Sequence, residues 1–330
     1  MGKIKFWLHN ARSLALPQSL LPAFTAVALS YGADEFSWGA AVASIFGIAF
    51  LHLGFNLLDD WFDYKEGSGE ARQAAATEGF RGRMVKYPYL TSGEATPGEL
   101  LKVVVIFLAL AAVCGAAVVA LRGWNTLWWM AATLILGVSY SGGPLKLGFH
   151  GLGEAVIFIM FGPLLMTGVH FAITGVVGWK IILLSVCVGL LVTNIVYSHS
   201  VMDAVPDKKM GKKTMAHLMG GIKGQLALSA VFNFLPFIII LIGVIFKVLH
   251  PAYLAVAVVL PVTIWLWRSL RRFVYGKDSR PEPKWWMGPM GDFEAYRKHG
   301  IDWFMIRWLT ARNIVMFFCA VLIIINLIVG

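Results

Sequence analysis

The chain has 330 residues, of which 58% are hydrophobic and only 14% are charged, with a formal net charge of +10. An ordinary soluble domain has about 25% charged residues, and a folded soluble chain of this size needs more polar cover than this one can supply. The composition therefore excludes a disordered chain, a small disulfide-stapled domain and a typical water-soluble enzyme. It predicts an all-α, polytopic membrane protein.

Apolar runs of roughly the length needed to cross a bilayer, about 20 residues, recur along the whole chain. We expect nine transmembrane helices, arranged as two pseudo-repeated four-helix halves plus a ninth helix. A long loop, residues 268–308, separates the last two spans. It is a solvated insertion, or it forms a surface-lying helix over Phe293–Trp308 or a lid over the acceptor. The predicted spans are Leu14–Tyr31, Trp38–Leu58, Leu101–Leu121, Trp124–Ser139, Gly153–Thr174, Trp179–Ser198, Gln225–Lys247, Ala252–Trp267 and Leu309–Val329.

The positive charges lie almost entirely on one side of this arrangement. All but three of the 28 Lys and Arg residues fall there, the exceptions being Arg122, Lys180 and Lys247. The positive-inside rule then places the N-terminus on the cytoplasmic side of a plasma membrane and the C-terminus outside. The +10 charge needs no nucleic acid as partner. All but two of the 18 Asp and Glu residues share the same side, which the rule does not require and which indicates a functional role.

The first acidic cluster ends the second predicted span, in the run Asn56-Leu-Leu-Asp59-Asp60-Trp-Phe-Asp63. On a helix, Asn56 and Asp63 share one face with either Asp59 or Asp60, because their spacings are three, four and seven residues. Three carboxylates within five residues repel one another, and a divalent cation with a preference for oxygen ligands relieves that repulsion.

The second acidic cluster follows the sixth predicted span. Asp203 and Asp207 are again four residues apart, and four lysines follow within six residues: Lys208, Lys209, Lys212 and Lys213. Carboxylates that hold Mg²⁺ beside lysines that meet phosphate oxygens suit a metal-bound diphosphate. Solvated loop charge is the simpler reading of either cluster alone. Two clusters after corresponding spans of the two halves favour the metal–diphosphate site.

A glycine-rich loop joins the fourth and fifth predicted spans, from Tyr140 to Glu154. Its backbone N–H groups could hold phosphate, although a tight turn between two spans also favours glycine. Tyr140 and Lys146 are candidate substrate contacts. Glu154 and His170 could equally be hydrogen-bonding residues between helices.

Together, these motifs resemble the UbiA superfamily of intramembrane prenyltransferases over nearly the whole chain. The family's first motif, Asn-Asp-x-x-Asp-x-x-x-Asp, is matched at Asp60 and Asp63, with Asp59 in the asparagine position and Gly67 in the last aspartate position. Its second motif is matched at Asp203, Asp207, Gly211 and Thr214. The first motif and the glycine-rich loop are most similar to the 1,4-dihydroxy-2-naphthoate branch of menaquinone synthesis. This chain departs from that branch before the second motif, where His199-Ser200-Val-Met202 replaces an Asn-Asn-x-Arg run.

The resemblance implies one prenyltransferase domain over residues 1–330, with helices around a central cavity. It implies the transfer of an isoprenyl group from a polyprenyl diphosphate to an aromatic acceptor within the bilayer, with Mg²⁺ as cofactor and no obligatory protein partner. The implied catalytic and metal-binding residues are Asp59, Asp60, Asp63, Asp203 and Asp207. The implied substrate contacts are Asn56, Arg83, Tyr140, Lys146, Lys208 and Lys212.

Several alternatives stay open at this stage. The same fold could act on hydroxybenzoate, homogentisate, haem, chlorophyll or a lipid, or could cyclise a terpene. An ion-coupled transporter would place its polar residues near the middle of the bilayer, whereas these charges lie at one end of the spans. A CDP-alcohol phosphotransferase would carry a different acidic motif on a single helix. A catalytically silent homologue is disfavoured because four motif aspartates are intact.

Overall fold

The computed structural model describes residues 2–65, 87–209, 213–277 and 280–329. These residues form helices and no β-strand, apart from a single bridge between His150 and Lys213. The expectation of an all-α membrane protein is therefore confirmed. The chain divides into two compact units: residues 1–146 with 164–177, and residues 147–163 with 178–330. Each unit is described separately.

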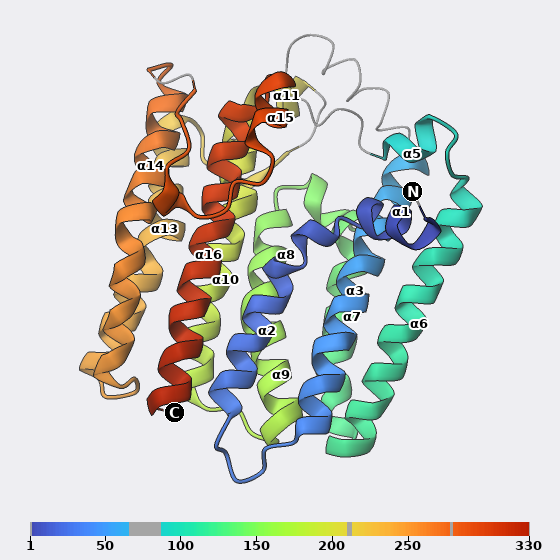
Figure 1. Cartoon of the computed structure of the whole chain (residues 1–330), viewed down its shortest axis with the longest axis vertical. Helices are drawn as coiled ribbons and strands as arrows, with labels where there is room; N and C mark the ends of the chain where they lie inside the picture. Colours follow the sequence, from blue (N-terminus) through green and yellow to red (C-terminus); the bar gives the residue numbers. More distant parts are fainter. Residues whose placement is uncertain (1, 66–86, 210–212, 278–279, 330) are drawn as a thin grey trace. The chain divides into compact units, whose positions relative to one another are not determined.

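The first unit is built on the contact between α3 (Trp38–Lys65) and α6 (Pro97–Arg122) (Figure 1). Small residues bring the two helices close together, since a Cβ atom added at Gly47 would lie 3.2 Å from the Cβ of Cys114. The remaining elements of this unit are α1 (Lys3–Asn10), η1 (Ser13–Ala15), α2 (Pro17–Ser30), α5 (Pro88–Thr91), η2 (Trp124–Thr126), α7 (Leu127–Ser141) and α9 (Leu165–Thr174).

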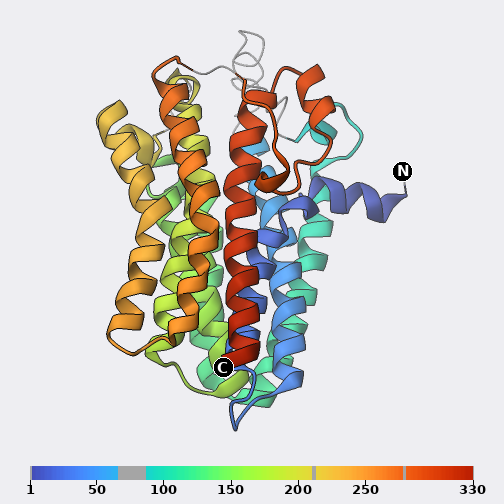
Figure 2. The same ribbon diagram turned by 60° about the vertical axis from the view of Figure 1, so that its left-hand side comes forward.

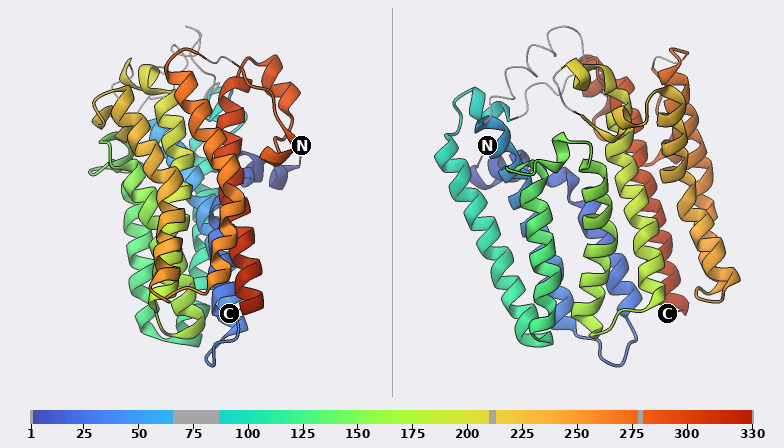
Figure 3. Two further views of the ribbon diagram at one scale, coloured as in Figure 1. Left: turned by 90° about the vertical axis from the view of Figure 1, so that its left-hand side faces the viewer. Right: turned by 180° about the vertical axis from the view of Figure 1, so that it is seen from behind.

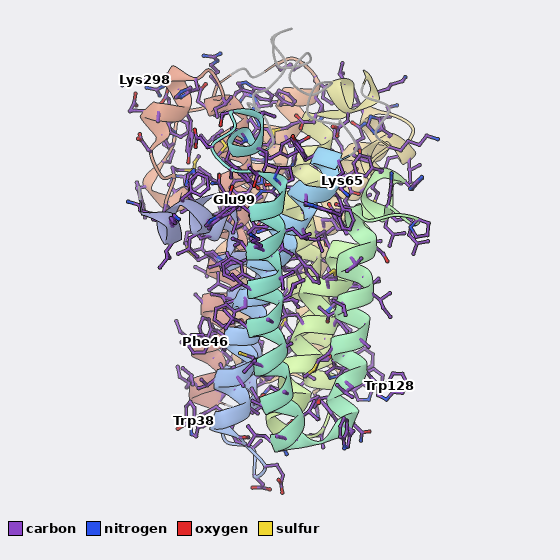
Figure 4. All side chains as sticks on the ribbon, turned by 90° about the vertical axis from the view of Figure 1, so that its right-hand side faces the viewer. Trp38, Phe46, Lys65, Glu99, Trp128 and Lys298 are labelled. Atoms are coloured by element: carbon purple, nitrogen blue, oxygen red, sulfur yellow. The ribbon has the colours of Figure 1, made fainter. Side chains whose placement is uncertain are left out.

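The start of α6 is encoded locally. Thr96 caps the helix by accepting a hydrogen bond from the Glu99 backbone N–H, and the Glu99 carboxylate accepts one from the Thr96 N–H at 2.8 Å. This reciprocal pair is a capping box, which satisfies N–H groups that a helix start otherwise leaves unpaired. Glu99 and Lys65 lie toward the same end of the first unit, and Trp38 and Trp128 lie toward the other (Figure 4). The adjacent helices α3 and α6 therefore run in opposite directions.

The second unit surrounds α10 (Trp179–Met202), which is the most deeply buried of its long helices. It packs against α13 (Ile222–Ile245) and α16 (Asp302–Val329). In Figure 3, α10 is yellow-green, α13 is golden yellow and α16 is red. In Figure 2, α16 runs beside α14 (Leu260–Val274). The other elements are η3 (Leu147–Phe149), α8 (Gly153–Ile159), η4 (Met160–Leu164), α11 (Ala204–Lys209), α12 (Met215–Leu218), η5 (Pro251–Val259), η6 (Trp285–Met287) and α15 (Phe293–Lys298).

The fifth predicted span is one continuous helical stretch that is shared between the units. It consists of α8, the π-helical turn η4 and α9, and Pro163 lies inside the turn. Proline has no N–H to donate to the preceding turn, and a wider turn accommodates that loss. The compact units thus divide this span near Pro163, whereas the expected four-helix halves would have kept it whole.

Eight helical segments of the described chain are long and apolar enough to cross a membrane. The fourth predicted span, Trp124–Ser139, corresponds to η2 followed by α7, which has only 15 residues. At 1.5 Å per residue α7 is about 22 Å long, which is shorter than a hydrocarbon core of about 30 Å. The membrane class is supported, and the count of nine spans is not confirmed.

The long loop before the last span is packed against α16. Asn313 donates hydrogen bonds to the backbone oxygens of Met287 (2.8 Å) and Pro289 (3.0 Å). A single surface helix over Phe293–Trp308 is not formed, because α15 ends at Lys298 and α16 already begins at Asp302. The last span therefore starts seven residues earlier than Leu309, its predicted first residue.

Candidate functional site

The first acidic segment, residues 59–63, forms part of the last turns of α3. Asp60 and Asp63 are buried, with 2% and 1% of their surface exposed, and the Asp59 side chain is 19% exposed. Ionised carboxylates are buried only when cations or hydrogen-bond donors compensate the loss of water. The partners of this segment within the first unit supply that compensation.

Arg12 is the positive partner of the first acidic segment. Its guanidinium makes an ion pair with Asp60 and a second contact with Asp59, where the N–O distance is 3.5 Å. Partial burial tends to lower the pKa of Arg12, but the adjacent Asp60 and Asp59 carboxylates outweigh it, and that pKa is raised. Arg12 also has a positive φ of 58°, a backbone conformation that is costly for a residue other than glycine. The surrounding contacts therefore hold Arg12 in place.

Hydroxyl groups complete the shell around these carboxylates. Tyr89, on α5, donates to Asp60 Oδ2 at 3.1 Å, and Ser141, at the end of α7, donates to Asp59. Burial, followed by the charge of Asp60, raises the pKa of Tyr89, so its phenol stays a donor. Tyr87 donates to the backbone oxygen of Asp63 at 3.2 Å. Figure 1 shows α5 beside the upper end of α3.

Asn56 makes a hydrogen bond to the N-terminal segment. Its amide nitrogen donates to the backbone oxygen of Ala11 at 3.0 Å, one residue before Arg12. This bond ties the N-terminal segment to α3 and helps to place the Arg12 guanidinium on the acidic segment. The assignment of Asn56 to substrate binding stays a prediction.

The first residues of the glycine-rich loop, which belong to the first unit, lie against the same end of α3. A Cβ atom at Gly142 would lie 2.9 Å from the Phe62 ring, so only glycine fits there without movement. The half-buried Tyr140 lies in the last turn of α7, and the half-buried Lys146 lies in the loop that follows and has a positive φ of 40°. Both residues stay candidates for substrate contact.

The second acidic segment, residues 203–207, directly follows α10 in the second unit. Asp203 is 2% exposed and Asp207 is 6% exposed. The Asp203 carboxylate pairs with His199 Nε2 at 2.7 Å, one helical turn earlier. The two aspartates are also one turn apart, since the Asp207 backbone N–H donates to the Asp203 backbone oxygen at 2.9 Å. Lys208 is exposed on α11. Arg83, Lys212, Gly67 and Gly211 lie outside the described residues.

Sequence reasoning missed four partners of these carboxylates: Arg12, Tyr89, Ser141 and His199. Arg12 is 48 residues from Asp60 in the sequence, and Tyr89 is 29 residues from Asp60. No local spacing pattern therefore predicts either contact. His199 was visible, because a histidine four residues before Asp203 shares its helical face.

The chemistry of the donor set suits a hard divalent cation. Its members are carboxylate oxygens, which Mg²⁺ prefers. The Arg12 pair shows that Asp59 and Asp60 already face a positive charge, and a cation would supply the same compensation. Within the described part of the chain, no three acidic, His or Cys side chains are grouped closely enough to define a metal site by themselves. A bound cation would therefore take further ligands from its substrate or from water.

Three known proteins place this chain among its relatives. A 1,4-dihydroxy-2-naphthoate octaprenyltransferase from Haemophilus influenzae is 26% identical over 229 residues, which are 68% of this chain and 72% of that protein. The apo structure of a UbiA homolog from Aeropyrum pernix K1 has a TM-score of 0.64 at 18% identity and covers 95% of this chain and 98% of its own. A UbiA homolog from Archaeoglobus fulgidus bound to GPP and Mg²⁺ has a TM-score of 0.56 at 18% identity, over 96% and 99% of the two chains.

The structural relatives share the fold, and the family itself is assigned from the sequence. The sequence model of the UbiA prenyltransferase family matches residues 19–289, which include both acidic segments and the glycine-rich loop. Since this match extends over most of the molecule, the chain belongs to the UbiA prenyltransferase family.

Proposed function

We propose that this protein transfers an isoprenyl group from a polyprenyl diphosphate to 1,4-dihydroxy-2-naphthoate, and that the reaction depends on Mg²⁺. The observation that carries the proposal is the buried Asp60 and Asp63 pair at the end of α3, in a chain of the prenyltransferase family. Buried carboxylates with a neighbouring guanidinium are suited to holding a cation–diphosphate complex.

The proposed chemistry gives both acidic segments the same task, which is to hold Mg²⁺. Bound Mg²⁺ would stabilise the negative charge of the leaving diphosphate. The residues that we expect to hold the metal are Asp59, Asp60, Asp63, Asp203 and Asp207. Lys146, Lys208, Lys212 and Arg83 would neutralise the remaining phosphate charge, and Tyr140 would contact the substrate. The distribution of Lys and Arg supports a cytoplasmic N-terminus and active site.

The choice of acceptor is supported by the relatives. The Haemophilus influenzae relative is a 1,4-dihydroxy-2-naphthoate octaprenyltransferase, and a Synechocystis relative at 26% identity is a 2-carboxy-1,4-naphthoquinone phytyltransferase. These names share a naphthalene-derived acceptor and differ in the prenyl chain. We therefore propose the acceptor class and leave the length of the prenyl chain open.

The direct test uses the purified protein in detergent or nanodiscs with geranylgeranyl diphosphate as donor. We expect 1,4-dihydroxy-2-naphthoate to be prenylated, pyrophosphate to be released, and both to stop when EDTA removes Mg²⁺. Asp63→Asn and Asp203→Asn should each reduce turnover at least about 100-fold, because the metal would lose a charged ligand. Glu94→Gln, at an exposed acidic residue outside both segments, is the matched control and should keep full activity.

Two results would contradict the proposal. Full turnover in Asp63→Asn or Asp203→Asn would contradict the assignment of these aspartates to the metal site. Prenylation of 4-hydroxybenzoate but not of the naphthoate would keep the reaction and change the acceptor.

A further inference from the structure

The second acidic segment is tied to its surroundings by the carboxylate of Glu154. Glu154 begins the first turn of α8 and is 2% exposed. Its Oε1 atom accepts a hydrogen bond from the Ser200 hydroxyl at 2.8 Å, and its Oε2 atom accepts one from the Met215 N–H at 3.3 Å. Ser200 precedes Asp203 by three residues, and Met215 begins the helix after Asp207. One side chain therefore joins the helix before the segment to the helix after it.

A second side chain makes a similar connection. His217 Nδ1 accepts a hydrogen bond from the Thr214 N–H at 3.1 Å, so this nitrogen carries no proton. The other ring nitrogen, Nε2, must then be the donor, and it lies 2.7 Å from the backbone oxygen of Ala204. Ala204 is the residue next to Asp203. Neutral His217, with its proton on Nε2, thus connects the start of α12 to the start of the acidic segment.

These two ties act on the same short stretch of backbone. From α8, Glu154 holds one residue on each side of the acidic segment, and from α12, His217 contacts Ala204 within the segment. The backbone hydrogen bond from the Lys213 N–H to the Phe149 oxygen (3.3 Å) also holds the start of α12 near η3. Asp203 and Asp207 lie between the anchored positions. Ordering backbone residues costs conformational entropy, and two neighbouring carboxylates repel each other, so such a segment keeps one geometry only if it is held.

We propose that Glu154 and His217 are positioning residues that hold Asp203 and Asp207 in the geometry needed to bind Mg²⁺. Neither side chain is proposed to contact the metal or the substrate. The inference rests on the proposed function where it concerns metal binding. Its structural part, that the two side chains order the acidic segment, stands independently of the reaction. Residues that orient metal ligands commonly contribute 10–100-fold to metal affinity.

Four variants separate the two ties. Glu154→Ala removes both hydrogen bonds of the carboxylate, whereas Glu154→Gln can accept from Met215 and donate to Ser200, whose hydroxyl already reaches the Val196 oxygen. His217→Ala removes both bonds of the imidazole. His217→Gln keeps the bond to Thr214, because glutamine suits this position of a capping box, but is placed to lose the one to Ala204.

Two measurements are made on the full-length protein in nanodiscs. The first is the Mg²⁺ concentration for half-maximal pyrophosphate release, and the second is amide hydrogen–deuterium exchange of residues 203–209. We expect Glu154→Ala and His217→Ala to raise the Mg²⁺ requirement about tenfold or more and to speed the exchange of this segment. Glu154→Gln should stay close to the wild type in both measurements, and His217→Gln should be intermediate.

A control variant distinguishes positioning from general loss of stability. Tyr253→Phe removes a buried hydrogen bond to Asn326 elsewhere in the second unit, and it should leave the Mg²⁺ requirement and the exchange of residues 203–209 unchanged. Unchanged exchange in folded Glu154→Ala and His217→Ala would overturn the proposal. So would an equal effect of Tyr253→Phe.

Should the alanine variants not fold, wild-type exchange in His217→Gln would overturn the His217 tie, and strongly perturbed exchange in Glu154→Gln would overturn the hydrogen-bond account of Glu154. A wild-type protein that releases no pyrophosphate would refute the proposed function, while the exchange data would still decide the positioning role.

Discussion

The guanidinium of Arg12 pairs with the carboxylate of Asp60, and this contact joins the N-terminal segment to the end of α3. The Asp60 side chain is 3% exposed and that of Arg12 is 32% exposed. A carboxylate this deeply buried is stable in its ionised form only with a positive partner or several donors. Arg12 is the positive partner of Asp60, and Tyr89 is one of its hydrogen-bond donors.

Replacing Arg12 with alanine should destabilise the protein most strongly when Mg²⁺ is absent. We expect a loss of about 1–3 kcal/mol of unfolding free energy, between the values for exposed and buried ion pairs. Mg²⁺ should then raise the melting temperature more in Arg12→Ala than in the wild type, because the cation replaces the lost charge. Thermal unfolding in detergent with and without Mg²⁺ measures both quantities. Arg12→Lys is the control that keeps the charge, and equal Mg²⁺ shifts in the alanine variant and the wild type would contradict this view of the pair.

Removal of the Tyr89 hydroxyl should weaken the same site through Asp60. Tyr89→Phe leaves a buried carboxylate without one of its donors, and a hydrogen bond to a charged group contributes about 1.5–3 kcal/mol. We expect a lower melting temperature and a higher Mg²⁺ requirement for pyrophosphate release. Tyr64→Phe makes the same chemical change at an exposed tyrosine on α3. A similar loss in both variants would show that the hydroxyl of Tyr89 has no special role.

Gly142 should not tolerate even one added methyl group. Its Cβ would lie 2.6 Å from the Val138 oxygen and 2.9 Å from the ring of Phe62. We expect Gly142→Ala to destabilise the protein by about 1–3 kcal/mol and to displace the loop that carries Lys146. Combining it with Phe62→Leu should recover only part of the stability, because the Val138 oxygen belongs to the backbone and cannot move aside. Chemical denaturation of the two single variants and the double variant tests this, and complete recovery would argue against a backbone clash.

The features that sequence could predict are those encoded by local spacing. Asp60 and Asp63 share a helical face because they are three residues apart, and both lie at the end of α3 as the pattern indicated. Their burial is known only from the structure. Runs of apolar residues located the membrane helices for a similar reason, since length and hydropathy are properties of a single segment. The short α7 shows the limit of this reasoning, because its apolar run is clear while its helical length depends on where the chain turns.

The features that sequence could not predict depend on contacts between distant segments. The sequence around Arg12 does not predict its contact with Asp60, which is 48 residues away. The ties made by Glu154 and His217 likewise exist only once α8, α10 and α12 have packed together. The sequence indicates that Glu154 could form hydrogen bonds between helices, but only the structure identifies its two partners on either side of the second acidic segment.

The division of the fifth span near Pro163 leads to a last prediction, at Gly162. Here the wide turn η4 approaches α10 so closely that an added Cβ would lie 2.5 Å from both the Gly189 Cα and the Ser185 oxygen. Both atoms belong to the backbone of the most buried helix of the second unit, so no change of rotamer can relieve the contact. We expect Gly162→Ala to lower the unfolding free energy by about 1–3 kcal/mol or more.

Gly98→Ala is the matched control, because a Cβ on this residue of α6 would meet nothing within 4 Å. That variant should be neutral or gain about 0.5–1 kcal/mol from the better helix propensity of alanine. Thermal unfolding of the two variants under the same conditions compares them, and equal stability would mean that α10 and η4 can separate without cost.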